Sequence, residues 1–405
     1  MSEPGVTDLL TVEQAIAILD AEPVRPNVCA LPLADAVGLR LAEAIVADRD
    51  YPPFDKSLMD GYAVRSADLQ DGITELQCLG EIAAGTWPME TIGPGQTIAI
   101  MTGAPMPAGA DGVVPVEWLD ASQRLAPGRV ALRRVERPSR YVAKRGADAT
   151  AGQPLLGVGT RLGPAQIAVA ASVGSATVRV FTRPRVAVLG SGDEIVPIDA
   201  VPRPGQIRGS NNPMLVSLLG RLGCDATDLG IVRDHPDAVR EALQRGRDFD
   251  VLFITGGMSM GEHDYVPRTL IALGADVKVS KLRIKPGKPF VYATLGGTHV
   301  FGLPGNPVSA FVCTLRLSAR LLSRLTGGPA EPAWRFGALT EPLPANGPRE
   351  FYQPAVFNGR TVQPLKWHGS ADVYTLAAAN VLIVHPENAP ALQAGDAVRL
   401  LEIPT

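Results

Sequence analysis

Three glycine-punctuated segments carry the residue types of an anion-binding site. They are TGGMSMGEHDY (255–265), IKPGKP (284–289) and GLPGNP (302–307). Each adjoins a short β-branched run, so we expect the three loops to meet at one edge of a sheet. Glycine lets backbone N–H groups approach a ligand closely, and lysine supplies positive charge for phosphate or another oxyanion. The pattern therefore indicates an oxyanion site.

The basic residues around these loops support the same interpretation. Residues 277–330 contain eight Lys and Arg and no Asp or Glu, although the whole chain has a net charge of -3. The eight residues are Lys278, Lys281, Arg283, Lys285, Lys288, Arg316, Arg320 and Arg324. Such a concentration favours a ligand with several negative oxygens.

Other segments place polar side chains beside turns. They are PPFDKSLMDGYAV (52–64), MTGAPMPAGAD (101–111), GSGDEIV (190–196), GQIRGSN (205–211) and RDHPD (233–237). Their carboxylates could hold Mg²⁺ between the protein and a phosphate, and the helix expected after GQIRGSN could present free N–H groups to an anion. A capped surface turn, a plain hairpin connection and helix N-termini explain these segments as well.

Composition and missing motifs exclude several classes of function. The chain has 405 residues, of which 46% are hydrophobic, and this length indicates more than one domain. Its near-neutral charge balance and its aromatic content of only 5% disfavour a nucleic-acid binder. No apolar run reaches the ~18 residues of a membrane span, and the first residues do not resemble a signal peptide, so we expect a cytoplasmic protein with reduced thiols. The five histidines lack zinc-site spacing, and no P-loop, GxGxxG or G-x-S-x-G motif occurs.

The elements that must position these residues differ along the chain. Residues 11–20 predict an amphipathic helix whose Thr11 and Gln14 have capping-box spacing. Short apolar runs between turns predict a β-rich unit from about 52 to 145, and a further helix is expected over 163–173. From 185 to about 325, buried strands alternating with helices predict a parallel sheet with ligands at the carboxyl ends of its strands; one helix starts at Asn212 and Pro213. A Pro-rich break after Gly327 leads into a final small β domain.

The same motifs, in this order and spacing, resemble the molybdopterin molybdenumtransferase family, the MoeA-type proteins and the gephyrin E domain. The resemblance covers nearly the whole chain. It implies a multidomain α/β plus β protein: a discontinuous helical domain (1–50 and 146–180), an inserted β-rich domain (51–145), an α/β parallel-sheet molybdopterin-binding domain (181–327) and a C-terminal β-barrel (328–405).

The resemblance also implies a reaction and partners. Similar proteins insert molybdenum from molybdate into adenylylated molybdopterin and release AMP in a Mg²⁺-dependent step. They form homodimers in which the cleft between the third and fourth domains of one subunit meets the second domain of the other. Transient contacts with a molybdopterin adenylyltransferase and with molybdoenzyme acceptors follow from the same resemblance, with no nucleic acid and no membrane.

Carried over residue by residue, the resemblance assigns three groups of functional positions. The catalytic group is Asp60, Thr102, Asp148, Glu194, Asp234 and Asp264, of which Glu194, Asp234 and Asp264 are also the metal group. The binding group is Gly256, Gly257, Ser259, Lys281, Lys285, Lys288, Pro304, Pro307, Arg349 and Ser370.

Three positions depart from the family pattern, and two other functions stay open. Ala143 stands where the family has arginine, with Lys144 and Arg145 as its nearest substitutes, and Gln353 and Ala371 replace an arginine and a glycine. These changes affect the expected molybdate contacts. The alternatives are a molybdopterin adenylyltransferase, because the third domain serves either reaction, and a non-catalytic assembly protein like the gephyrin E domain.

Overall fold

The computed structural model describes residues 9–69, 73–120, 126–133, 136–258 and 265–404. The chain divides into two compact units. The first unit comprises Met1–Leu31, Gly38–Ala42 and Arg179–Thr405, and the second comprises Pro32–Val37 and Glu43–Val178. These units do not test the boundaries of the four expected domains, which stay a prediction. Within the described ranges, no helix is long and apolar enough to cross a membrane.

A six-stranded sheet in the order β16-β13-β17-β21-β20-β18 forms the centre of the first unit. Its first four strands are parallel, but β20 runs antiparallel to both β21 and β18. The strands are β13 (Arg185–Ser191), β16 (Asp225–Val232), β17 (Val251–Thr255), β18 (Asp276–Ser280), β20 (Val291–Leu295) and β21 (Thr298–Leu303). The prediction of a parallel sheet was therefore wrong for β20, whereas β18 runs in the same direction as the four parallel strands. Only Gly296 and Gly297 separate β20 from β21, which is a hairpin connection and too short for a crossover.

Because β20 runs in the opposite direction, the loop before it lies at the edge of the sheet where the parallel strands end. Strands β13, β17 and β21 end at one edge of the sheet, and β20 begins at that edge. Residues before β20, such as Lys288 and Pro289, therefore lie at the same edge as residues after the parallel strands. This arrangement brings the IKPGKP segment to the glycine loops that follow β17 and β21.

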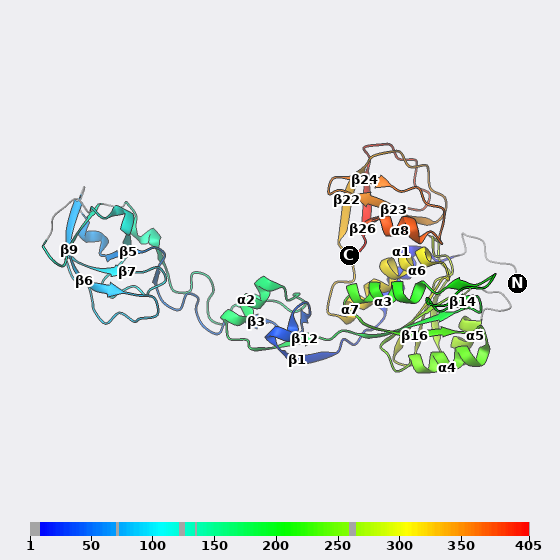
Figure 1. Ribbon diagram of the computed structural model, residues 1–405. Helices are drawn as coiled ribbons and strands as arrows, with labels where there is room; N and C mark the ends of the chain where they lie inside the picture. Colours follow the sequence, from blue (N-terminus) through cyan, green and yellow to red (C-terminus); the bar gives the residue numbers. More distant parts are fainter. Residues whose placement is uncertain (1–8, 70–72, 121–125, 134–135, 259–264, 405) are drawn as a thin grey trace. The chain divides into compact units, whose positions relative to one another are not determined.

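Helices cover both faces of this sheet because its central strands are buried on both faces. In β17, Val251 and Phe253 pack into one core with α3, α6 and α7, whereas Leu252 and Ile254 pack into another with α4 and α5. Figure 1 shows these helices on the two sides of the sheet. The helices are α3 (Asn211–Arg221), α4 (Pro236–Gly246), α5 (Tyr265–Ala272), α6 (Pro307–Cys313) and α7 (Ala319–Leu325), with a π-helical turn at Thr314–Ser318.

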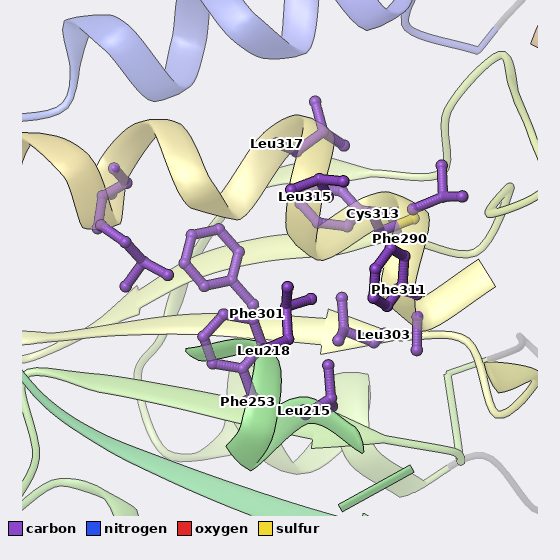
Figure 2. Close-up of a cluster of buried hydrophobic side chains, with 14 of the residues drawn as sticks. Leu215, Leu218, Phe253, Phe290, Phe301, Leu303, Phe311, Cys313, Leu315 and Leu317 are labelled. Atoms are coloured by element: carbon purple, nitrogen blue, oxygen red, sulfur yellow. The ribbon is translucent and has the colours of Figure 1, made fainter. Parts of the chain in front are cut away.

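The larger core joins elements that are distant in the sequence. Figure 2 shows Leu215 and Leu218 of α3 with Phe253 and Phe301 of the sheet, together with Leu315 of the π-helical turn. Helix α1 (Val12–Ala21) adds Val12, Ala15 and Leu19 to this core. Its N-terminus has the capping box predicted for Thr11 and Gln14.

The C-terminal part of the first unit is a closed barrel, as expected. Strand order is β19-β23-β24-β22-β26-β25, and a pairing of β23 with β25 closes it. The strands are β19 (Ile284–Lys285), β22 (Trp334–Leu339), β23 (Glu350–Phe357), β24 (Thr361–Pro364), β25 (Val381–His385) and β26 (Ala397–Glu402), and α8 (Val373–Ala378) follows β24. Strand β19 comes from the IKPGKP segment and pairs in parallel with β23. The barrel is thereby attached directly to the segment that carries Lys285.

The second unit is β-rich, as predicted for 52–145. Its main sheet has the order β8-β5-β7-β6-β9, and β10-β4 and β11-β3 form two further pairs. A three-stranded sheet with the order β1-β12-β2 consists mainly of residues of the first unit. The bounds are β1 (Val28–Pro32), β2 (Arg40–Leu41), β3 (Ile45–Val46), β4 (Lys56–Ser57), β5 (Gly61–Val64), β6 (Ile73–Ile82), β7 (Gln96–Ile100), β8 (Gly112–Pro115), β9 (Arg129–Arg133), β10 (Val142–Ala143), β11 (Pro154–Leu156) and β12 (Thr177–Phe181). Helix α2 (Pro164–Ser172) starts after Gly163, as expected.

Helix α3 begins at Asn211, one residue before the predicted start, and ends before Gly223, whose φ is +85°. Asp193 and Glu194 lie on the turn between β13 and β14 (Ile195–Val196), so a helix N-terminus does not explain them. Strand β14 pairs with β15 (Ile207–Arg208) before α3 begins.

Candidate functional site

The glycine loops meet at the carboxyl edge of the sheet, as predicted. A cavity of about 710 Å³, called here the glycine-loop cavity, is lined by residues from all three segments. Six of the predicted site residues line this cavity: Glu194, Asp234, Gly256, Gly257, Pro304 and Pro307. Its size lies within the ~300–1,000 Å³ typical of small-molecule sites.

Close backbone packing explains why glycine is required in these loops. A Cβ on Gly256, whose φ is +87°, would lie 2.1 Å from the carbonyl oxygen of Ser191. The N–H of Gly256 donates to the carbonyl of Leu303 at 3.2 Å, which joins the loop after β17 to the end of β21. Gly256 therefore combines a conformation and a contact that a larger side chain would prevent.

Two carboxylates face this cavity beside the glycine loop. Ser191 Oγ donates a hydrogen bond to Oδ1 of Asp234, and the Asp234 N–H donates to Asp193 at 3.3 Å. Asp234 is thus held by the end of β13, while the exposed Glu194 lines the same cavity. A pair of carboxylates is the donor set that Mg²⁺ takes when phosphate and water supply its remaining ligands. No cluster of three His, Cys, Asp or Glu that could hold a metal ion occurs among the described residues.

A second cavity, called here the lysine cavity, adjoins the first. Its volume is about 560 Å³, and it is lined by the predicted site residues Lys285, Lys288, Pro304, Arg349 and Ser370. Pro289, Pro304 and Asn306 line both cavities, so the two cavities adjoin, and together they are called here the groove. Lys281 lines neither cavity, and Ser259 and Asp264 lie outside the described residues.

Aromatic side chains of the barrel hold Lys285 in the lysine cavity. Lys285 pairs with Phe351 across β19 and β23, and its Nζ lies 4.7 Å from the centre of the Phe351 ring. Phe351 in turn stacks with Trp367 at 5.8 Å between ring centres. Because an ammonium is attracted to an aromatic face, this contact directs Lys285 toward the barrel side of the groove.

The barrel is also tied to the GLPGNP loop. Nδ2 of Asn306 donates to Oγ of Ser370 at 2.8 Å, and the Val308 N–H donates to the Ser370 carbonyl at 3.0 Å. The hydroxyl and the carbonyl of Ser370 are therefore both held by the α/β domain. Asn306, Phe351 and Trp367 were not among the predicted site residues. The only sequence signals for them were the position of Asn306 between Gly305 and Pro307 and the scarcity of aromatic residues.

Most of the eight basic residues in 277–330 have structural roles, which corrects the charge argument. Lys278 pairs with Glu22, Arg283 with Glu387 at 3.4 Å, and Arg320 with Asp20 and Glu331. Arg324 donates to the carbonyls of Leu19 and Glu22 at the end of α1. Acidic residues from other segments thus neutralise much of the basic run. The positive charge of the lysine cavity comes from Lys285, Lys288 and Arg349.

Arg316 links the π-helical turn to the barrel in a buried network. Its Nε donates to the Tyr352 hydroxyl at 2.7 Å, and that hydroxyl donates to Oε1 of Glu350. All three residues are buried, and burial raises the pKa of Tyr352. Glu350 and Tyr352 flank Phe351 on β23, so this network fixes the strand that carries the ring beneath Lys285.

In the second unit, Asp60 and Thr102 lie in direct contact. Asp60 precedes β5 and Thr102 follows β7, and these strands pair with Gly61 opposite Ile100. Oδ1 of Asp60 accepts from the Thr102 N–H at 2.7 Å and from its hydroxyl at 2.8 Å. The backbone hydrogen bond, followed by the hydroxyl bond, lowers the pKa of Asp60. The arrangement presents an ionised, exposed carboxylate on a defined loop.

The segment after β10 contacts the same region through ion pairs. Lys144 Nζ lies 2.7 Å from Asp55, and Arg145 Nε lies 2.7 Å from Asp50. The Lys144 hydrogen bond is the main cause that lowers the pKa of Asp55. Lys144 and Arg145 are therefore paired within this unit, and their substitution for the arginine expected at position 143 stays a prediction. The exposed Asp148 is placed by its N–H, which donates to the Tyr51 carbonyl at 2.8 Å.

Fold and groove together define a multidomain α/β protein with a small-molecule site between its sheet and a C-terminal barrel. Three family models match the chain. The MoeA N-terminal region (domain I and II) matches residues 10–174, the probable molybdopterin binding domain matches 187–324, and the MoeA C-terminal region (domain IV) matches 337–403.

Curated relatives and solved structures agree with these matches. The molybdopterin molybdenumtransferase of Nostoc sp. is 34% identical over 91% of this chain and 87% of that protein, and the one of Bacillus subtilis is 32% identical over 92% and 89%. The crystal structure of the molybdopterin biosynthesis MoeA protein from Pyrococcus horikoshii matches with a TM-score of 0.83 at 30% identity, covering 98% of this chain and 99% of that one. The chain belongs to the molybdopterin molybdenumtransferase family.

Proposed function

We propose that this protein inserts molybdenum from molybdate into adenylylated molybdopterin and releases AMP in a Mg²⁺-dependent step. Its family makes it an enzyme of molybdenum cofactor biosynthesis. The observation that carries the specific proposal is the groove formed by the two adjoining cavities. One end offers glycine loops and carboxylates, and the other offers two lysines, an arginine and a serine.

The two ends of the groove suit the two substrates of the proposed reaction, molybdate and adenylylated molybdopterin. The lysine cavity suits molybdate, because charged donors such as Lys285, Lys288 and Arg349 favour a tetrahedral oxyanion. The glycine-loop cavity suits the phosphate-bearing part of the substrate, since backbone N–H groups approach closely there. The shared residues Pro304 and Asn306 then lie between the two reactants.

Glu194 and Asp234 are the described residues that we propose hold Mg²⁺, with Asp264 as a third candidate. When bound, Mg²⁺ would neutralise charge on the phosphates of the adenylylated substrate. Ser191 would keep the Asp234 carboxylate oriented toward the cavity through its hydrogen bond. Isothermal titration with Mg²⁺ and AMP tests this assignment: AMP should bind more tightly with Mg²⁺ than without it, and Asp234→Asn should reduce that difference.

Anaerobic incubation of the protein with adenylylated molybdopterin, Mg²⁺ and molybdate tests the proposed reaction. We expect AMP and molybdenum cofactor to form in equal amounts, with AMP measured by chromatography and cofactor measured by reconstitution of a molybdoenzyme. Consumption of ATP with unmodified molybdopterin, and no AMP release from the adenylylated form, would instead indicate an adenylyltransferase. The family matches outside the molybdopterin-binding domain do not favour that alternative or a pure scaffold.

We further propose that the active form is a cytoplasmic homodimer in which Asp60 and Thr102 of one subunit act at the groove of the other. The ordered Asp60 carboxylate on a separate unit supports this proposal. Mixing Asp60→Ala subunits with Lys288→Ala subunits should restore part of the activity, because some mixed dimers would contain one intact site. Absence of any recovery after verified subunit exchange would show that both residues act within one chain, or that the Asp60 segment is only a structural turn. Contacts with an adenylyltransferase and with acceptor enzymes also belong to this proposal.

A further inference from the structure

Tyr374 lies at the rim of the glycine-loop cavity but is almost entirely exposed. Its exposed fraction is 86%, and among the large hydrophobic side chains that the structure describes only Met89 in the second unit is more exposed. Tyr374 nevertheless lines the cavity together with Ala371 and Val373 of the barrel. An exposed aromatic ring on the wall of a small-molecule site is available for contact with a ligand.

The backbone beneath Tyr374 is held firmly. Asp372 caps α8: its carboxylate accepts from the Thr375 N–H at 3.1 Å, from the Thr375 hydroxyl at 2.7 Å and from the His368 N–H at 3.0 Å. The preceding Ser370 is fixed by Asn306 and Val308. The ring of Tyr374 is therefore exposed on an ordered segment, and ordering it against a ligand costs little entropy because tyrosine has only two side-chain torsions.

A second exposed apolar side chain, that of Ile207, lines the same cavity. Ile207 of β15 is 59% exposed, and it lines the cavity beside Arg208. Arg208 is oriented by a hydrogen bond from its Nε to the Ala200 carbonyl at 3.0 Å. The cavity thus has a floor of glycine loops that suits phosphate and a rim of exposed ring and aliphatic side chains that suits a flat apolar surface.

We infer that Tyr374 is a stacking platform for a planar bicyclic heterocycle that is joined to a phosphate, and that it thereby sets the affinity of this site for its substrate. This inference rests on the proposed function, whose substrate contains two such heterocycles, a pterin and an adenine. Stacking on an aromatic side chain tolerates either ring system, since each has a π-face. The hydrogen-bonding capacity of the phenol is not required for this role.

Binding measurements with three probes test the inference without the transfer reaction. The probes are AMP, the phosphate ester of 6-hydroxymethylpterin, and ribose 5-phosphate, which lacks a heterocycle. The variants are Tyr374→Ala, Tyr374→Phe and the matched control Phe336→Ala. Phe336 is another exposed aromatic residue of the barrel, at 65%, and it lines neither the glycine-loop nor the lysine cavity. Because Tyr374 and Phe336 are exposed, their substitutions should leave the melting temperature unchanged.

We expect Tyr374→Ala to weaken one of the two heterocyclic probes by roughly fivefold to a hundredfold, as for other base-stacking side chains. Ribose 5-phosphate should bind as before, and Tyr374→Phe and Phe336→Ala should behave like the wild type. Loss for AMP alone identifies adenine as the stacked ring, and loss for the pterin ester alone identifies the pterin. Unchanged binding of both heterocycles to Tyr374→Ala, or an equal loss for ribose 5-phosphate, would overturn the inference while leaving the proposed function intact. Failure of the wild type to bind either heterocycle would overturn both.

Discussion

Asn306 and Ser370 are joined by a hydrogen bond of 2.8 Å from the Asn306 amide to the Ser370 hydroxyl. This bond connects the GLPGNP loop of the α/β domain to the barrel at the point where the glycine-loop and lysine cavities adjoin. It means that the hydroxyl of a predicted molybdate-contacting residue is oriented by a residue from another domain. The two ends of the groove are therefore mechanically connected through Asn306.

Asn306→Ala should raise the KM for molybdate with little effect on folding, because Asn306 is exposed. A neutral hydrogen bond contributes about 0.5–1.5 kcal/mol, or roughly twofold to tenfold in KM. The double variant Asn306→Ala/Ser370→Ala should lose less than the sum of the single variants, since the two side chains act together. Steady-state kinetics with varied molybdate measure this coupling, and strictly additive losses would show that the bond has no functional role.

Arg316→Met should strongly destabilise the protein. It would leave the Glu350 carboxylate and the Tyr352 hydroxyl buried without their cation, a change that costs about 3–5 kcal/mol. The control is Arg335→Met, because Arg335 forms an exposed pair with Glu402 at 3.5 Å that should contribute less than about 1 kcal/mol. Thermal and urea unfolding measure the stability of both variants. Equal stability of the Arg316→Met and Arg335→Met proteins would contradict the assigned role of the network.

The pKa of Asp60 should depend on Thr102. Because hydrogen bonds from Thr102 lower this pKa, the carboxylate stabilises the folded state above the ordinary Asp value of ~3.9, and that contribution is lost as pH falls through the lower folded pKa. Thr102→Val removes the hydroxyl bond but keeps the backbone bond, so the pKa should rise only part of the way toward its ordinary value. Thr102→Ser should leave it unchanged. An NMR titration of the Asp60 carboxyl carbon measures this pKa. An unaltered pKa in Thr102→Val would show that the hydroxyl of Thr102 does not lower the pKa of Asp60.

Lys144→Ala should have only small effects. Its ion pair with Asp55 is exposed, and such pairs contribute about 0–1 kcal/mol. Because the Lys144 charge is already paired in the second unit, we expect the rate of molybdenum insertion to stay within about twofold of the wild type. A large rise in the KM for molybdate would show that Lys144 takes the role of the arginine that the resemblance led us to expect at position 143.

Local sequence signals predicted the parts of the fold that depend on neighbouring residues. The capping box of Thr11 and Gln14 and the meeting of the three glycine loops were both predictable, because spacing and backbone freedom determine them. The direction of β20 was missed although Gly296 and Gly297 indicate a hairpin. Alternating apolar runs show that a strand is buried but not which way it runs.

The lysine cavity was harder to predict because its partners are distant in sequence. Charge counting could not show that Arg320 pairs with Asp20, some 300 positions earlier in the chain. Likewise, the contact of Lys285 with Phe351 depends on the pairing of β19 with β23, which joins two domains. Sequence spacing identified the lysines, whereas only the fold shows which of them line the groove.

The molybdate dependence of the insertion rate in Lys285→Ala and Lys288→Ala tests the central claim most directly. Charged donors to an oxyanion contribute about 1.5–3 kcal/mol each, so both variants should raise the KM for molybdate by roughly tenfold to a hundredfold. The control Lys366→Ala changes an exposed lysine of the barrel that lies outside both cavities and should behave like the wild type. Melting temperatures near the wild-type value should accompany these results. Normal insertion by both cavity variants at limiting molybdate would contradict the assignment of the groove as the site of molybdenum insertion.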